Sequence, residues 1–299
     1  MKKGKKTSLK KGLRILGIGT GSLVALILLA YVVIYLNIRW RIGKTYSIPD
    51  ETMQVNYDSA SLKNGEHLVA TRACKECHGQ DLGGNILIDD FAIGRFVSKN
   101  LTKGQGGLPD DYSVHDWVRA MKHGLNKKNQ PLFLMPSHEL SQLSEEDLSD
   151  IIAYCSRLPN VDREMPPFRI GPLAYVLTAF DLIPLLPAEM TDHSRPLVKA
   201  VAAEVSVEYG RYLSAVCINC HGQNFKGGAS PVPGGTPVAD ISSTGNPGKW
   251  THEQFITTLK TGNTPEGKVL KPEEMPWTIT RAYTDEELTA LHLYLQSVR

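Results

Sequence analysis

The residues best suited to chemistry in this 299-residue chain are two cysteine pairs, each followed directly by a histidine. One copy contains Cys74, Cys77 and His78, and the other contains Cys217, Cys220 and His221. Thiols can form disulfides, ligate metals or take part in redox exchange, and imidazole is a common metal ligand. The shared spacing, C-x-x-C-H, is also that of covalent c-type haem attachment.

Haem attachment explains every position of this pattern. Two thiols three residues apart can bond to the two vinyl groups of one haem, and the next residue then places an imidazole beneath the iron. We therefore predict two haems c, attached covalently through the four motif cysteines. His78 and His221 are the predicted proximal ligands of the two irons.

Other uses of the cysteine pairs account for less of the pattern. A thioredoxin-like dithiol lies in a strand-helix-strand context, which neither copy shows. A four-cysteine zinc site does not require a histidine directly after each second cysteine. A free pair outside the cytoplasm could also form a disulfide. Haem attachment uses four of the five cysteines and leaves Cys155, which we expect to be a small buried thiol.

An internal repeat surrounds the two motifs. Residues 100–102 match residues 240–242 at an offset of 140, and the Met-Pro dipeptides that begin at Met135 and Met275 match at the same offset. The last helices also correspond, each with a hydroxyl residue at its start and a carboxylate three residues later. The repeat predicts two homologous domains.

Each domain is predicted to be built from helices. A helical stretch precedes each motif, an amphipathic helix closes each domain, and a further helix lies between them. These helices are expected at 65–72 and 210–216, from near Ser113 and Thr251, and from Ser144 and Thr284. The remaining loops are rich in Gly, Pro and Lys, and no sustained period-2 pattern supports a sheet, so the expected fold is all-α.

The order of motif, Met-Pro dipeptide and closing helix in segments 64–158 and 209–298 resembles the class I cytochrome c family. This resemblance implies that Met135 and Met275 are the distal haem ligands. A soft thioether favours reduced iron and raises the reduction potential. Core packing is the ordinary role of a methionine, and His138, three residues past Met135, is the rival ligand for the first haem.

The start of the chain is basic and then apolar. The first fourteen residues hold seven Lys and Arg and no acid, whereas the remainder carries 26 basic and 31 acidic residues, which argues against a nucleic-acid partner.

Residues 15–36 carry no charge, and a helix of that length spans roughly 33 Å, enough to cross a bilayer. A cleaved signal peptide would have a shorter apolar run. Basic residues favour the cytoplasm, so the domains should lie on the extracytoplasmic, periplasmic side of the cell (inner) membrane.

These patterns divide the chain into six parts. They are a cytoplasmic basic tail (1–14), a transmembrane helix (15–36), a juxtamembrane linker (37–60), a first cytochrome c domain (61–160), an inter-domain linker (161–203) and a second cytochrome c domain (204–299). The inter-domain linker is apolar over residues 170–188, but three prolines and Asp181 interrupt it, so we expect it between the domains or at the membrane surface. It resembles the linker of the cytochrome c subunits of membrane-bound alcohol and gluconate dehydrogenases, which carry three haems.

These features predict an electron-transfer protein and not an enzyme, although it could be a subunit of an oxidoreductase complex. His/Met-ligated iron has no open position, so we expect no small-molecule substrate. The expected partners are the membrane and redox proteins, namely a dehydrogenase, a quinol-oxidising complex or a terminal oxidase. The motif spacing does not exclude a dihaem peroxidase with one open haem site, and a haem-based sensor or assembly subunit is a third hypothesis.

Overall fold

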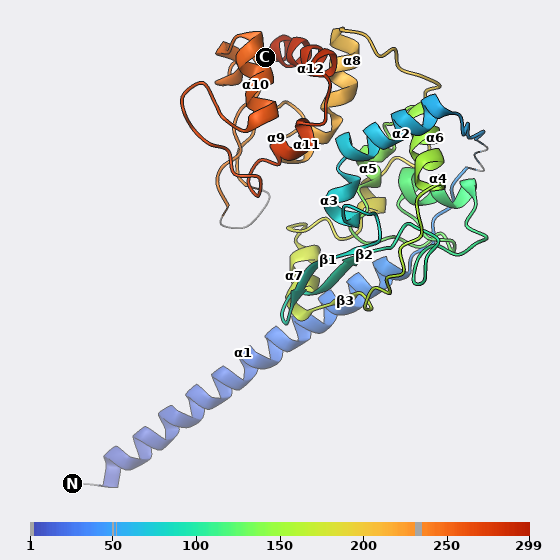
Figure 1. Ribbon diagram of the computed structural model, residues 1–299. Coiled ribbons are helices and arrows are strands. Elements are labelled where there is room, and N and C mark those ends of the chain that lie inside the picture. The colour runs from blue at the N-terminus through green and yellow to red at the C-terminus, as the bar shows by residue number, and fades with distance from the viewer. Residues whose placement is uncertain (1–2, 50, 52, 231–234) are drawn as a thin grey trace.

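The computed structural model describes residues 3–49, 51, 53–230 and 235–299, with the backbone alone for residues 3–10. A long helix, α1 (Lys3–Gly43), leads from the N-terminal end to two globular domains that lie next to each other (Figure 1). Residues 1 and 2 of the predicted basic tail, and residues 231–234 of the predicted second domain, lie outside the described residues.

The first domain is mainly helical, and polar side chains cap its helices. Asp58 and Ser144 each accept a hydrogen bond from the backbone amide three residues later, and Ser113 forms a capping box with Asp116. The helix that starts at Ser113 ends at Gly124, whose left-handed backbone (φ 65°) suits glycine. The helices of this domain are α2 (Ser59–Thr71), α3 (Cys74–His78), α4 (Val114–His123), α5 (Ser137–Leu140) and α6 (Glu145–Cys155).

The second domain repeats this order. Thr251 and Thr284 form capping boxes with Gln254 and Glu287, and Gly262 (φ 75°) ends the helix that Thr251 begins. Its elements are α8 (Val207–Leu213), the 3-10 turn η2 (Ser214–Cys217), α9 (Ile218–His221), the 3-10 turn η3 (Pro247–Lys249), α10 (His252–Thr261), α11 (Trp277–Thr280) and α12 (Asp285–Ser297).

In each domain the first and last helices cross at a glycine. A Cβ atom at Gly65 of α2 would lie 2.1 Å from the carbonyl oxygen of Asp150 and 2.7 Å from Cβ of Tyr154, both on α6. A Cβ atom at Gly210 of α8 would lie 1.9 Å from the carbonyl oxygen of Ala290 on α12. Only glycine permits backbones to approach so closely. The crossing fixes the helix that leads into each cysteine motif.

Each domain has its own apolar core, and two of its predicted site residues lie against it. The first core joins α2, α4 and α6, and Cys74 and Met135 pack against it. The second core joins α8, α10 and α12, and Cys217 and Met275 pack against it. Each core therefore holds one cysteine motif and one Met-Pro methionine in the same half of the chain.

A small antiparallel sheet departs from the all-α prediction. Strand β1 (Asn85–Asp90) pairs with β2 (Gly94–Ser98), and β2 pairs with β3 (Arg169–Ile170). The first two strands have six and five residues and the third has two, so their alternating pattern is too short to recognise in sequence. The protein is thus mostly helical, with one three-stranded sheet in the part of the chain that the structure describes.

The inter-domain linker packs on the first domain and on α1. It contains β3, α7 (Pro172–Ala179) and the 3-10 turn η1 (Pro187–Met190). Helix α7 lies along α1 (Figure 1), where the rings of Tyr35 and Tyr175 are 4.9 Å apart. Near the end of α1, Arg41 pairs with Glu189, and Ile42 packs on a small core with α7. The last turns of α1 are therefore part of the first domain.

Candidate haem-binding sites

The first cysteine motif forms the short helix α3, and the second starts at Cys217, the last residue of η2, and continues as α9. In the first, the backbone reverses at Ala73, which has a left-handed φ of 60°, and α3 then starts at Cys74. The short helices end at Gly79 and Gly222, with φ values of 81° and 74°. The second cysteine of each motif is exposed, and all five cysteines of the chain are free thiols. Two unlinked thiols on a single turn meet the requirement for attachment to one haem.

The two motif histidines are oriented in the same way by backbone carbonyls. Nδ1 of His78 lies 2.8 Å from the carbonyl oxygen of Lys99, and Nδ1 of His221 lies 2.8 Å from that of Ala239. Because a carbonyl only accepts, Nδ1 carries the proton and Nε2 keeps its lone pair. Burial lowers the pKa of both imidazoles, and the carbonyl hydrogen bond opposes this in part. Each neutral ring therefore presents Nε2 as a metal ligand.

The two Met-Pro methionines occupy equivalent local structures. The carbonyl oxygen of Met135 accepts a hydrogen bond from the Ser137 amide at 2.7 Å, and that of Met275 accepts one from the Trp277 amide at 2.7 Å. The intervening proline caps a short helix in both cases, α5 and α11. Each methionine is half-buried against the core of its own domain. One thioether thus shares a core with one attachment motif in each domain.

His138, the rival to Met135, contacts the other domain. Its Nε2 lies 3.1 Å from Oδ1 of Asn219, a residue between the two cysteines of the second motif. The same nitrogen lies 3.8 Å from a carboxylate oxygen of Glu139. Nε2 of His138 is therefore engaged in a contact between the domains.

The first cysteine of each motif lacks the lowered pKa of a reactive dithiol. Burial raises the pKa of Cys74 and of Cys217 to about 12, whereas reactive dithiols depend on a lowered pKa. Cys155 is buried in the first core, and burial raises the pKa of this thiol as well. Among the described residues, no three His, Cys, Asp or Glu side chains form a metal site. In each domain, two thiols, one oriented imidazole and one thioether fit haem c.

Two charged residues near the motifs have no counterpart in the repeat. Arg72, two residues before Cys74, is 8% exposed, and Ala215 takes its position before the second motif. Glu139 follows Met135 by four residues, and burial raises the pKa of its carboxyl to about 7, against the opposing charge of Arg72. A comparison of the two repeats cannot identify either residue, because each is present in only one repeat. The signal in the sequence that could have identified Arg72 is a cation two residues before an attachment motif.

Comparisons with known proteins divide the chain in the same way. Residues 60–155 match the family described as cytochrome c oxidase, cbb3-type, subunit III, and residues 207–299 match the cytochrome c family. The gluconate 2-dehydrogenase cytochrome c subunit of Pantoea cypripedii is 31% identical to this chain over 102 residues. That alignment covers 32% of this chain and 23% of the length of the relative.

Proposed function

We propose that this chain, whose two globular domains are class I cytochrome c domains, is a membrane-anchored carrier of single electrons with two haems c. Matches to cytochrome c domains and to a dehydrogenase cytochrome subunit support electron transfer rather than catalysis. The observation that carries the proposal is the duplicated donor set. In each domain, the first motif cysteine and the Met-Pro methionine pack against one core, and the motif histidine is held through Nδ1 by a backbone carbonyl.

In this proposal the side chains of each motif hold one haem. The thiols of Cys74 and Cys77 in the first domain, and of Cys217 and Cys220 in the second, would hold the haem through thioether links formed by addition of S–H across its vinyl double bonds. Nε2 of His78 and of His221 ligates the iron, while the carbonyl groups of Lys99 and Ala239 fix the orientation of the rings. The bound haem supplies the one-electron chemistry, and the protein supplies position and potential.

We propose Met135 and Met275 as the distal ligands. As ligands, their thioethers would stabilise the reduced iron and would leave no open site for peroxide or another substrate. The contact of His138 with Asn219 supports Met135 over His138 in the first domain. A filled position in both domains disfavours a dihaem peroxidase.

Helix α1 supports attachment to a membrane. Residues Lys11–Gly43 form a helix of 33 residues, whose most apolar window has a mean hydropathy of 2.3 and is 6% buried. Such a helix is about 50 Å long and a hydrocarbon core about 30 Å thick, so part of α1 extends beyond the bilayer. Ile38 is fully buried and Arg41 pairs with Glu189, which supports an uncleaved anchor. The basic N-terminal tail favours the extracytoplasmic side of the inner membrane for both domains.

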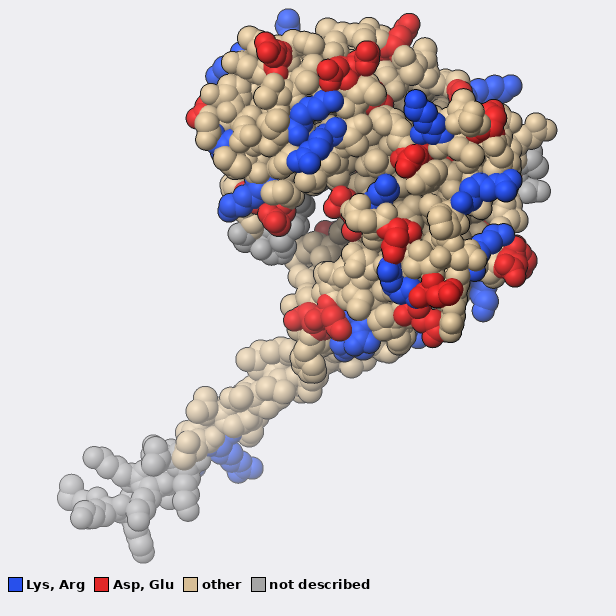
Figure 2. All heavy atoms as spheres, viewed as in Figure 1, with Lys and Arg blue, Asp and Glu red and all other residues tan. Residues whose placement is uncertain are grey.

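The proposed partners are redox proteins at the same membrane. One relative is named as a dehydrogenase cytochrome subunit, and the first domain matches a family named after an oxidase subunit. We propose that electrons arrive from a dehydrogenase or a quinol-oxidising complex and leave to a terminal oxidase. On the face shown in Figure 2, acidic and basic side chains are interspersed over both domains. Such a surface suits transient contacts more than strong steering by one sign of charge.

Spectroscopy of the purified full chain tests this proposal. The pyridine haemochrome spectrum should show two haems c per chain, and low-temperature EPR of the oxidised protein should show low-spin iron alone. Met135→Ala and Met275→Ala should each convert one haem to high spin. Met190→Ala is the control, because Met190 is 60% exposed. A high-spin haem that binds peroxide in the unchanged protein would contradict the carrier function and favour the peroxidase.

A further inference from the structure

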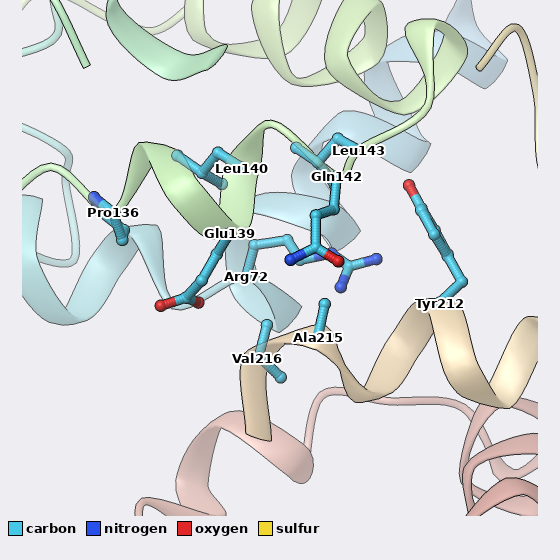
Figure 3. Close-up of a pocket in the computed structure, with 9 residues that line it drawn as sticks. All are labelled: Arg72, Pro136, Glu139, Leu140, Gln142, Leu143, Tyr212, Ala215 and Val216. Carbon is cyan, nitrogen blue, oxygen red and sulfur yellow. The ribbon is translucent and has the colours of Figure 1, made fainter. Parts of the chain in front are cut away.

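The two domains meet along a seam formed by the C-terminal end of α2 and by α5 in the first domain, and by α8 and η2 in the second. Figure 3 shows the centre of this seam, a small pocket in which Arg72 extends between side chains of both domains. Glu139 and Gln142 line it from α5 and the residues that follow, and Tyr212 and Ala215 line it from the second domain.

Polar contacts close the seam. The Tyr212 hydroxyl donates to the Asp147 carboxylate at 2.5 Å and accepts from the Ser144 amide at 3.1 Å. The Tyr283 hydroxyl donates to the carbonyl oxygen of Thr71 at 3.3 Å. These hydrogen bonds join the two domains at the seam.

The seam reaches both cysteine motifs. Thr71 and Arg72 end α2 directly before the first motif, and the contact between His138 and Asn219 ends inside the second. On the same side, Nε2 of His67 lies 2.8 Å from the Glu287 carboxylate across the two domains. The segments that carry the two haem sites therefore border one interface.

Arg72 lies close to both motifs. It precedes Cys74 by two residues, and the pocket that it lines also includes Ala215 and Val216, the two residues directly before Cys217. Glu139 lines the same pocket from the first domain. Because the interaction of two charges falls with distance, a charge at this place acts on both motifs.

The Arg72 guanidinium is buried without full pairing. Its Nε and Nη2 have no hydrogen-bond partner among the described residues, and its central carbon lies 4.9 Å from the centre of the Tyr212 ring. A cation in such a place is costly unless negative charge appears nearby. Arg72 can therefore stabilise an added electron at either neighbouring site.

We propose that the two haem sites exchange electrons across this seam, and that Arg72 raises the reduction potential of both. This inference rests on the proposed function. In the exchange, one iron is oxidised from Fe(II) to Fe(III) as the other is reduced from Fe(III) to Fe(II), so no proton or further reactant is required. Reduction adds one negative charge at a site, and a nearby buried cation stabilises that charge with little screening by salt.

A redox titration of the full dihaem chain tests the role of Arg72. Arg72→Met removes the charge and keeps a long side chain, and both midpoint potentials should shift to lower values. Arg72→Lys should restore them in part or in full. Arg157→Met is the matched control, because Arg157 also stacks on a tyrosine, Tyr57, at 5.0 Å but is exposed. A shift of only one potential, or equal shifts in the control, would overturn the assignment.

Circular dichroism in the Soret region tests the proximity of the two sites. Two neighbouring haems should give a paired positive and negative band. Tyr212→Phe combined with Glu287→Gln removes polar contacts of the seam and should weaken this band, while the absorption and EPR spectra of each haem stay unchanged. A spectrum of the unchanged protein that equals two independent haems would overturn electron exchange across the seam. Failure of the proposed function would look different, because two low-spin haems would not be found at all.

Discussion

At the scale of single residues, one hydrogen bond decides which nitrogen of each motif histidine can face an iron. The carbonyl groups of Lys99 and Ala239 supply that bond, at the same distance in both domains. The histidines themselves are recognisable in the sequence because they belong to contiguous motifs. Their acceptors are not recognisable, because any residue type offers a backbone carbonyl and only the path of the loop selects one.

Glu139 gives the seam a pH dependence. Burial raises the pKa of its carboxyl to about 7, so the folded chain binds this proton more tightly than the unfolded chain does. The stabilising contribution is therefore complete below the unfolded pKa of about 4.5 and is lost as pH rises through about 7. Hydrogen exchange at α5 and η2 should be slower at about pH 5 than at about pH 8 after correction for the intrinsic rate.

Glu139→Gln should remove this pH dependence, and Glu146→Gln, an exposed change in the same domain, should leave it in place. Arg72 and the cysteines of both motifs also face Glu139, but they do not titrate in this range once the thiols are bonded. Nε2 of His138 lies 3.8 Å from the Glu139 carboxylate, so His138→Gln is measured in parallel. If the slope disappears with His138→Gln and persists with Glu139→Gln, the assignment to Glu139 is wrong.

At the scale of elements, the sequence predicted the features that depend on neighbouring residues and did not predict those that depend on distant parts of the chain. The predicted helix starts at Ser113, Ser144, Thr251 and Thr284 are confirmed, because an N-cap depends on residues within one turn. The sheet was not predicted, because β2 gains its second partner from β3, more than seventy residues later in the chain. The position of α7 against α1 likewise depends on a partner that no local pattern specifies.

The glycine crossings predict a large cost for a single methyl group. Gly65→Ala places Cβ 2.1 Å from the backbone oxygen of Asp150, which cannot move without displacing α6. We expect a loss of about 3 kcal/mol in the free energy of unfolding, at the upper end of overpacking effects. Guanidinium unfolding followed by far-ultraviolet circular dichroism measures it.

Glu66→Ala is the control for this crossing, since Glu66 is the next residue on α2 and is exposed. It should change the stability by less than about 0.5 kcal/mol. Gly210→Ala should repeat the loss in the second domain, where Cβ would lie 1.9 Å from a backbone oxygen. Equal stability of Gly65→Ala and Glu66→Ala would show that the helices do not cross as closely as described.

At the scale of the whole molecule, the sequence indicated two domains and an anchor but not their arrangement. The motifs, the Met-Pro dipeptides and the closing helices recur within each copy, so they define the domains without reference to any partner. The seam depends on Arg72 and Glu139, which lack repeated equivalents, and on tyrosines with many possible roles. Contacts between unlike surfaces leave no periodic signal in a sequence.

Three exposed apolar side chains are predicted to lie at the membrane surface. Phe91, Phe180 and Leu182 are 86%, 66% and 51% exposed, and α7 packs on α1 at Tyr35, next to the end of the predicted span. Nitroxide labels at Phe91→Cys and Phe180→Cys, in the full chain in nanodiscs, should be more accessible to oxygen than to a water-soluble nickel chelate. Val269→Cys, at a 68% exposed site in the second domain, should show the opposite. Identical behaviour at all three sites would contradict this placement.

The continuous joint between α1 and the first domain also limits how the molecule can move. A flexible tether would let the domains swing through a hemisphere of a radius set by its length. Here the buried Ile38 and the pair of Arg41 with Glu189 extend the anchor into the body of the protein. With α1 in a bilayer, as proposed, the protein would still diffuse laterally and rotate about the bilayer normal, but each proposed haem site would stay at a constant height above the lipid. Only partners that present their own redox centre at a matching height above the bilayer could then exchange electrons with this protein.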